Sequence, residues 1–200
     1  AMQRKEVYAT SGPRIGLRFF GGWDFSGADL EGADLAAAGY GRGVSMGGEL
    51  GAGPEGTAPS FLVMATRDPA DANLDRVQVI KGWLDDDGMT REKIYNLAWS
   101  GDRHPDRDGT LPPVGNTVDL ATGSYSNSIG APELVAAWTD PDFDPERPAF
   151  YYVRVLQIPT PRHTLLDAIA LGKDPADTGH PPTIQDRAYS SPIWYNPPEG

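Results

Sequence analysis

The stretch AFYYVRVLQI, residues 149–158, decides the fold. It is the most strand-like run of the chain, dense in the aromatic and β-branched residues that favour strands. Tyr151, Val153 and Val155 recur at every second position, so a strand places them on one face of a sheet. We therefore predict a strand in the core of a sheet, which ends at Pro159 because proline cannot donate to the ladder.

Further strands are expected on both sides of this run. They lie at residues 14–20, 59–66, 74–84, 89–99 and 189–195. Residues 59–66 are apolar at consecutive positions, which is typical of a central strand covered on both faces. The runs at 74–84 and 89–99 flank a polar turn that ends in Gly88, and this pattern predicts a hairpin.

Glycine and proline modify two of these strands. Gly82 predicts a bulge in the first arm of the hairpin, because a glycine inside a strand often marks irregular pairing. Pro192 interrupts the last strand. A proline without an N–H favours a sheet edge, so we expect the last strand at an edge.

Helix is expected only in short pieces. Residues 131–138 begin with Pro132 and Glu133, which suit the first turn of a helix, and we predict a helix there. Residues 164–171 are expected to form one or two helical turns, and residues 21–43 a loop with one helical turn. Short strands, a hairpin, long ordered loops and one or two short helices predict a mainly β fold, an antiparallel β-sandwich.

Charge and residue usage exclude several functions. The 200 residues include 17 Lys and Arg against 28 Asp and Glu, a net charge of -11 that repels nucleic acid and anionic membranes. No apolar run approaches the ~20 residues of a membrane-spanning helix, so we expect no insertion into a membrane. The chain has no cysteine, which rules out disulfides and a cysteine nucleophile within it.

Metal-ligating residues show only one weak pattern. The three histidines, His104, His163 and His180, have no metal-ligand spacing. Asp140, Asp142 and Asp144 have the alternating carboxylates of a calcium loop, and they are weak calcium candidates. Pro145 follows them where such a loop needs a glycine, so acidic turns that bind their own backbone are the alternative.

Aromatic residues are the better candidates for a binding surface. The chain holds five tryptophans and eight tyrosines. Such side chains combine a flat apolar body with a polar group, and they are enriched at interfaces. The candidates for a ligand groove or an interdomain surface are Trp83, Trp99, Trp138 and Trp194. The alternative is that most of them pack in the core.

Six blocks of the sequence resemble a known family. They are residues 5–15, 43–50, 74–83, 112–119, 150–156 and 184–195. These blocks span nearly the whole chain, and they resemble the C-terminal region of the bacterial domain-of-unknown-function 3604 family. The resemblance implies an N-terminal part similar to metal-dependent hydrolases of the polymerase-and-histidinol-phosphatase type, with a divalent metal in that part.

The resemblance also implies a domain organisation. Residues 1–10 are expected to be the tail of a helix from a missing N-terminal catalytic part, and residues 11–200 a single β-sandwich domain. Tyr8 and Arg14 lie near this junction, and they are the candidates for contacts with the catalytic domain. We expect no cofactor and no catalytic residue within these 200 residues.

Three functions are open from the sequence. The first is a non-catalytic accessory domain of a metal-dependent hydrolase, phosphoesterase or amidohydrolase-like, with its own catalytic domain as partner. The second is a module that binds a small-molecule ligand, for example a carbohydrate, through an aromatic surface. The third is a hydrolase with an unrecognised carboxylate pair. An apolar patch near the N-terminus favours the first and an aromatic-lined groove the second. The compartment is open, with a periplasmic or secreted location in a bacterium favoured over the cytoplasm.

Overall fold

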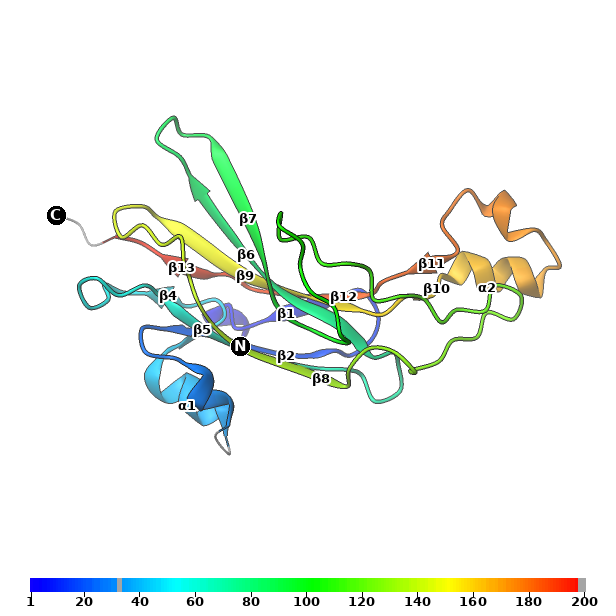
Figure 1. The fold of residues 1–200 in the computed structure, drawn as a ribbon, viewed down its shortest axis with the longest axis horizontal. Coiled ribbons are helices and arrows are strands. Elements are labelled where there is room, and N and C mark those ends of the chain that lie inside the picture. Colours follow the sequence, from blue (N-terminus) through cyan, green and yellow to red (C-terminus); the bar gives the residue numbers. More distant parts are fainter. Residues whose placement is uncertain (32–33, 198–200) are drawn as a thin grey trace.

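Two β-sheets pack face to face in the computed structural model, which describes residues 1–31 and 34–197 (Figure 1). The larger sheet contains β1 (Tyr8–Thr10), β4 (Glu49–Leu50), β6 (Leu74–Leu84), β7 (Thr90–Trp99), β9 (Ala149–Gln157), β12 (Arg187–Ser190) and β13 (Ile193–Tyr195). The smaller sheet contains β2 (Gly16–Gly22), β3 (Val44–Ser45), β5 (Ser60–Thr66) and β8 (Glu133–Thr139). Among the described strands only β4 and β13 pair in parallel. The predicted mainly β fold, an antiparallel β-sandwich, is confirmed.

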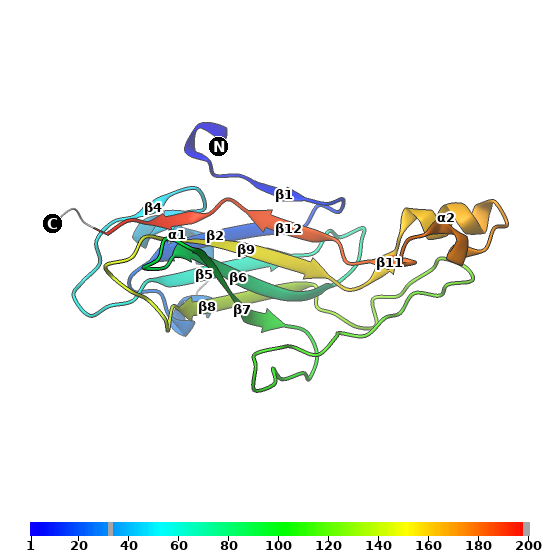
Figure 2. The same ribbon diagram turned by 90° about the horizontal axis from the view of Figure 1, so that it is seen from above.

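Strand β9 is the centre of the larger sheet, as its sequence predicts. It pairs with β6 along one edge and with β12 and β13, end to end, along the other (Figure 2). Tyr151, Val153 and Val155 face the smaller sheet and are fully buried. The alternate residues Phe150 and Tyr152 are half-buried on the outer face. The two-residue period of the strand therefore divides it between the core and an outer surface.

Strand β5 is the central strand of the smaller sheet, which confirms the prediction for residues 59–66. It lies between β2 and β8. Its residue Leu62 packs with Phe20 and Phe25 in a second, smaller core on the outer face of this sheet. The helix α1 (Leu35–Arg42) covers that core (Figure 1). Apolar residues on both faces of β5 are thus explained by two separate layers.

The predicted hairpin is present as β6 and β7. Its register runs from Leu84 opposite Thr90 to Arg76 opposite Trp99, with a bulge between Val77 and Gln78. The prediction of a bulge at Gly82 is wrong, because Gly82 pairs regularly with Phe150. A Cβ atom at this position would lie 2.3 Å from the Phe150 ring. The glycine is therefore explained by a close aromatic neighbour.

The predicted helix at residues 131–138 is wrong, because β8 occupies this segment. Leu134 and Ala136 are buried at alternate positions, as in a strand with one face on the core. The carbonyl oxygen of Pro132 accepts a hydrogen bond from the backbone N–H of Arg67 at 2.9 Å. Pairing with the whole length of β5 outweighs the helix preference of a short Glu, Leu and Ala segment.

The N-terminal segment also departs from its prediction. A single 3-10 turn, η1 (Met2–Arg4), takes the place of the expected helix tail, and it ends at Lys5 in a left-handed conformation. Residues 8–10 form strand β1, which pairs with β12 at the edge of the larger sheet. Residues 8–10 are thus built into the sandwich through a backbone ladder.

Pro192 interrupts the last strand as predicted, but that strand is not at the sheet edge. The break separates β12 from β13, and β1 and β4 pair on their outer side. The carbonyl oxygen of Pro192 accepts from the backbone N–H of Gly47 at 2.9 Å. Pro192 lies between β12 and β13, where no strand requires its N–H, so the proline does not need an open sheet edge.

Short helices complete the fold. Residues 21–43 contain the 3-10 turn η2 (Gly27–Leu30) and the eight-residue helix α1, more helix than the single turn predicted; residues 32 and 33 lie outside the described residues. The predicted turns at 164–171 are helix α2 (His163–Ala170). Together with β10 (Thr160–Pro161), β11 (Thr183–Ile184) and η3 (Pro175–Thr178), α2 forms a lobe that projects from one end of the sandwich (Figure 1).

The core between the sheets contains the alternate residues Tyr151, Val153 and Val155 of β9, as predicted, together with residues of β5 and β6. Phe61, Val63, Val77, Val79, Tyr151, Val153 and Val155 are fully buried and belong to one cluster. We expect Val153→Ala to lower the free energy of unfolding by about 2 kcal/mol, through lost burial and a residual cavity. Urea unfolding of both proteins measures this difference. A change as small as that of a surface substitution would contradict the burial of Val153.

Candidate functional site

Four aromatic side chains form a continuous row on the outer face of the larger sheet, and we call this row the aromatic stripe. Its members are Trp194 of β13, Phe150 and Tyr152 of β9, and Tyr189 of β12. The ring centroids of Trp194 and Phe150 are 5.3 Å apart, those of Phe150 and Tyr152 6.4 Å, and those of Tyr152 and Tyr189 6.4 Å. Helix α1 covers the smaller sheet and α2 lies in the projecting lobe (Figure 1), and 42% of Trp194 is exposed.

The stripe arises from strand alternation. In the run 149–158 the aromatic Tyr151 points into the core, so its neighbours Phe150 and Tyr152 must point outward. Trp194 lies opposite Phe150 in the register, which brings the two rings together. Of these four residues only Trp194 was predicted from its residue type as a candidate for a binding surface. The outward positions of the strand 149–158 carry the signal that would have identified Phe150 and Tyr152.

A groove opens at the Trp194 end of the stripe. Its volume is about 450 Å³, and it lies between the β6–β7 hairpin and strands β9 and β13. The hairpin bends away from the sandwich towards its tip and forms one side of the groove (Figure 1). The aromatic residues in the lining are Trp83, Phe150 and Trp194, and the polar ones include Arg91, Glu92 and Asn196. A pocket with flat apolar walls and a few polar groups is typical of a small-molecule site.

A row of polar side chains runs beside the other end of the stripe. The Arg154 guanidinium donates to the Gln78 amide oxygen at 2.9 Å, and the Gln78 amide donates to Asn96 Oδ1 at 2.8 Å. The Arg187 guanidinium donates to the Tyr189 hydroxyl at 3.4 Å and lowers the pKa of that phenol. Burial raises the pKa of the Tyr152 phenol. The stripe is therefore bordered by oriented hydrogen-bonding groups.

A buried ion pair lies beneath Trp83. The Lys81 ammonium donates to Asp140 Oδ2 at 2.6 Å and to the Asp142 carbonyl oxygen at 2.7 Å. The Tyr151 hydroxyl donates to the same Asp140 oxygen at 2.7 Å. Lys81, Asp140 and Tyr151 are all buried, and burial raises the pKa of the Tyr151 phenol. Lys81 and Asp140 bond to each other, and each has a further bond, to the Asp142 carbonyl oxygen and from the Tyr151 hydroxyl respectively. This cluster therefore fixes the loop after β8 to the larger sheet.

The outer part of this network is exposed. The Lys93 ammonium donates to Asp142 Oδ2 at 2.5 Å, and the Tyr95 hydroxyl donates to the same oxygen at 2.6 Å. These bonds lower the pKa of the Asp142 carboxyl, and burial raises the pKa of the Tyr95 phenol. Asp142 is thus held as a carboxylate between two donors.

The calcium candidates Asp140, Asp142 and Asp144 lie in this loop. Lys81 and Tyr151 engage Asp140, and Asp144 faces Arg147 at 3.6 Å. Within residues 1–31 and 34–197, no group of three or more His, Asp or Glu side chains has the arrangement of a metal site. The geometry favours ion pairs in this loop over a bound calcium ion.

The four candidate tryptophans lie in three different places. Trp83 and Trp194 line the same groove. Trp138 packs against Phe61, with ring centroids 5.6 Å apart, and against Tyr95 at 4.7 Å. Trp99 is partly buried, and its indole N–H donates to the Arg103 carbonyl oxygen at 2.6 Å. Two of the four therefore border one groove, Trp194 from the outer face of the sheet and Trp83 from a position that also packs against the core.

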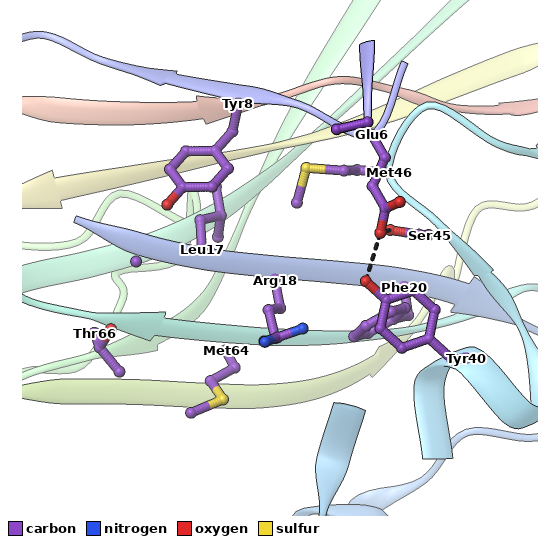
Figure 3. Close-up of a pocket in the computed structure, with 12 residues that line it drawn as sticks. Glu6, Tyr8, Leu17, Arg18, Phe20, Tyr40, Ser45, Met46, Met64 and Thr66 are labelled. Carbon is purple, nitrogen blue, oxygen red and sulfur yellow. Dashed lines mark hydrogen bonds between the residues drawn. The ribbon is translucent and has the colours of Figure 1, made fainter. Parts of the chain in front are cut away.

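A second pocket, of about 530 Å³, lies beside the N-terminal segment (Figure 3). Its lining includes Tyr8 from β1, Leu17 and Phe20 from β2, Tyr40 from α1 and Met64 from β5. The candidate Tyr8 thus borders a mainly apolar pocket.

The other junction candidate, Arg14, lies outside this lining. Arg14 is exposed, and its backbone N–H donates to the Asp68 carboxylate at 2.8 Å.

Glu6 holds the N-terminal segment beside this pocket. Its carboxylate accepts hydrogen bonds from the Tyr40 hydroxyl, as Figure 3 shows, from Ser45 Oγ at 3.0 Å and from the Arg4 guanidinium at 2.9 Å. The bond from Tyr40 is the largest cause that lowers the pKa of the Glu6 carboxyl from 4.5 to about 2. The same bond raises the pKa of the Tyr40 phenol. Glu6 therefore connects the N-terminal segment to α1 and β3 as an anion.

Replacement of Glu6 by glutamine is expected to reduce stability in a pH-dependent way. Because the folded-state pKa is lower than 4.5, the carboxylate stabilises the fold fully above pH 4.5, and this contribution is lost as the pH falls towards about 2. The difference in unfolding free energy between the wild type and Glu6→Gln should therefore shrink across this window, as measured by urea unfolding at several pH values. Glu55→Gln, in an exposed loop, is the matched control and should show no such trend. A difference for Glu6→Gln that is independent of pH would contradict the anionic contact.

The fold and these two surfaces define a β-sandwich domain with an aromatic-lined outer face and an apolar pocket at its N-terminal segment. The chain belongs to the family described as "Protein of unknown function (DUF3604)", whose sequence model matches residues 1–197. Searches of curated proteins and of solved structures gave no match. In the described part of the chain no helix is long and apolar enough to cross a membrane.

Proposed function

We propose that this chain is a non-catalytic accessory domain of a metal-dependent hydrolase, with phosphoesterase or amidohydrolase-like chemistry in a separate catalytic domain. Its role is to support that domain through a direct contact. The proposal starts from the family resemblance of the sequence, in which the hydrolase part precedes the region that this chain matches. A divalent metal belongs to the catalytic domain in this proposal.

The observation that carries the proposal is the group of exposed apolar side chains around the N-terminal pocket. Tyr8 and Tyr40, which line the pocket, are 43% and 55% exposed, and Met2 and Val7 in the same N-terminal segment are 88% and 39% exposed. Contiguous exposed apolar surface marks interaction sites in soluble proteins. The N-terminal face is therefore the surface that we assign to the catalytic domain.

The test uses a longer protein that includes the proposed catalytic domain. Val7→Ser combined with Tyr8→Ser should increase hydrogen exchange across the N-terminal face and separate the melting transitions of the two domains. Leu171→Ser, an exposed leucine on the α2 lobe, is the matched control and should change neither measurement. Unchanged exchange in the double variant would refute the assigned contact.

Arg14 receives its own variant in the same protein. Its guanidinium can donate to several acceptors across a domain boundary. We expect Arg14→Ala to speed exchange at the junction, whereas unchanged exchange and activity would make Arg14 an ordinary surface residue.

A second candidate function is ligand binding through an aromatic surface, and the aromatic stripe with its groove favours it. The two functions use different faces of the molecule, so one domain can perform both. The second function requires a small molecule to bind at Trp83, Phe150 and Trp194, and an environment-sensitive apolar dye such as anilinonaphthalene sulfonate probes it directly. Dye fluorescence that is the same in the wild type and Trp194→Ala would contradict it.

A further inference from the structure

We propose that the aromatic stripe binds an extended, neutral oligosaccharide, an inference that rests on the second function proposed above. The sugar rings stack on Trp194, Phe150 and Tyr152, and their hydroxyl groups contact the polar side chains beside the stripe. The inference adds the chemical class of the ligand and its direction along the sheet.

The first argument is the shape of the surface. The Phe150 and Tyr152 rings are nearly parallel, with an interplanar angle of 16°, and both residues are half-buried on the outer face of the sheet. A sugar ring presents one face of C–H groups, and the electron-rich face of an aromatic ring attracts such weakly positive hydrogens. Flat rings presented on one sheet face therefore match successive sugar rings better than a single rounded ligand.

The second argument is length. In the register, Trp194 lies opposite Phe150 and Tyr189 lies opposite Arg154, four residues further along β9. At about 3.3 Å per residue the stripe spans about 13 Å. Such a span exceeds one sugar ring, so the ligand is a chain of sugars that lies along β9.

The third argument is the polar border. Arg154, Gln78 and Asn96 form a hydrogen-bonded row beside the stripe, and Arg91 and Glu92 border the groove. A purely apolar ligand would cover these groups without offering them any further hydrogen bond. A ligand with hydroxyl groups along its edge supplies both donors and acceptors to them.

The fourth argument is charge. Aromatic rows also stack nucleic-acid bases, but the net charge of -11 repels a polyanion. The same repulsion disfavours a chain of acidic sugars. Around the stripe, the arginines outnumber the one carboxylate, Glu92, but each arginine already has a partner: Arg91 pairs with Asp85, Arg154 donates to Gln78 and Arg187 donates to Tyr189. Because these guanidinium groups are already engaged, a neutral sugar chain is the class of ligand that we propose.

The stripe is also rigid before any ligand binds. All four rings are on strands, and the Phe150 ring lies directly over Gly82, where a Cβ atom would come within 2.3 Å of it. Gly82→Ala therefore has to displace the Phe150 ring while it leaves every aromatic residue in place. A preorganised row loses less entropy on binding than a mobile one.

The experiment is isothermal titration of the 200-residue chain with neutral hexasaccharides, namely cellohexaose, xylohexaose, mannohexaose and chitohexaose. We expect at least one of them to bind and Trp194→Ala and Tyr152→Ala each to weaken it by about tenfold or more. Tyr8→Ala is the matched control, since Tyr8 is as exposed as Trp194 but lies outside the stripe and its groove; its affinity should equal that of the wild type. Gly82→Ala should weaken binding as well.

The outcomes separate this inference from the function on which it rests. Failure of all four hexasaccharides to bind at millimolar concentration would overturn the oligosaccharide proposal, and so would binding that Trp194→Ala and Tyr152→Ala leave unchanged. If the sugars fail but Trp194→Ala abolishes the binding of anilinonaphthalene sulfonate, the stripe binds a different class of ligand and the second proposed function stands. If the stripe variants change the binding of neither probe, both the oligosaccharide proposal and the second proposed function are refuted. Circular dichroism and thermal melting establish that each variant is folded before titration.

Discussion

Asp140→Asn is expected to lower the free energy of unfolding by about 3–5 kcal/mol, the range found when one partner of a buried ion pair is removed. Asp140 is buried, and one of its oxygens accepts from both Lys81 and Tyr151. The substitution keeps the shape of the side chain but leaves the Lys81 ammonium in the interior without a counter-charge. Urea unfolding at neutral pH measures the loss.

Two further variants identify the cause. Lys93→Met removes the ammonium of the neighbouring pair with Asp142, whose side chains are about half exposed, and it should cost no more than about 1 kcal/mol. Lys81→Met combined with Asp140→Leu removes both buried charges, and it should be less destabilising than Asp140→Asn alone. If Asp140→Asn were as mild as Lys93→Met, the pair would not be the buried anchor that the structure indicates.

The buried pair also supports the candidate binding site. The Lys81 ammonium lies 5.6 Å from the centre of the Trp83 ring, and Trp83 is one of the residues that line the groove. Asp140 begins the loop that leads to Pro148 and Ala149, and these two residues line the same groove. Loss of the pair is therefore expected to loosen the Trp83 side of the groove before it affects Tyr189, at the opposite end of the stripe.

Most of the long strands were predictable from sequence. The alternation of Tyr151, Val153 and Val155, and the doubly apolar run of β5, each specify a strand and its place in a sheet. The prediction of a helix for the β8 segment was wrong, because Glu, Leu and Ala favour a helix in so short a segment. Pairing with the neighbouring β5 makes it a strand. Local preference is a weak guide for a segment of one or two turns.

The ion pair was hidden from sequence for a different reason. Lysines are rarely buried, so an inward position for Lys81 in β6 is a poor expectation from its residue type. When Lys81 is not expected to be buried, the three aspartates of the loop look like the oxygen ligands of a calcium ion. The structure supplies the cation from a strand that is far away in sequence. A pattern of carboxylates alone cannot distinguish a metal from an ammonium group.

The candidate surface was predictable in part. Trp83 and Trp194 were selected by residue type, and β9 brings them to one groove because it pairs with both β6 and β13. Trp138 has the same residue type but fills the core, since β8 turns it towards Phe61. Which aromatic residues face outward depends on strand register, and register is specified by the whole sheet.

The core residue with the largest expected effect is Phe61. It is fully buried, and its ring contacts those of Phe19 at 5.5 Å, Trp138 at 5.6 Å and Tyr151 at 4.6 Å. We expect Phe61→Ala to lower the free energy of unfolding by about 3–5 kcal/mol, because the lost burial adds to the cavity left between the two sheets. Phe61→Leu keeps most of the volume and should cost clearly less.

The same substitution tests how the core supports the aromatic stripe. Tyr151 packs on Phe61 at the core-facing side of the larger sheet, whereas its neighbours Phe150 and Tyr152 belong to the aromatic stripe on the outer side. When Phe61→Ala removes that support, Tyr151 gains room to move, and hydrogen exchange along β9 should rise together with the loss of stability. The comparison with Phe61→Leu is made by urea unfolding and by exchange at the β9 amides. A loss below about 1 kcal/mol for Phe61→Ala, the size expected at a surface position, would show that the two sheets do not depend on this aromatic cluster for their packing.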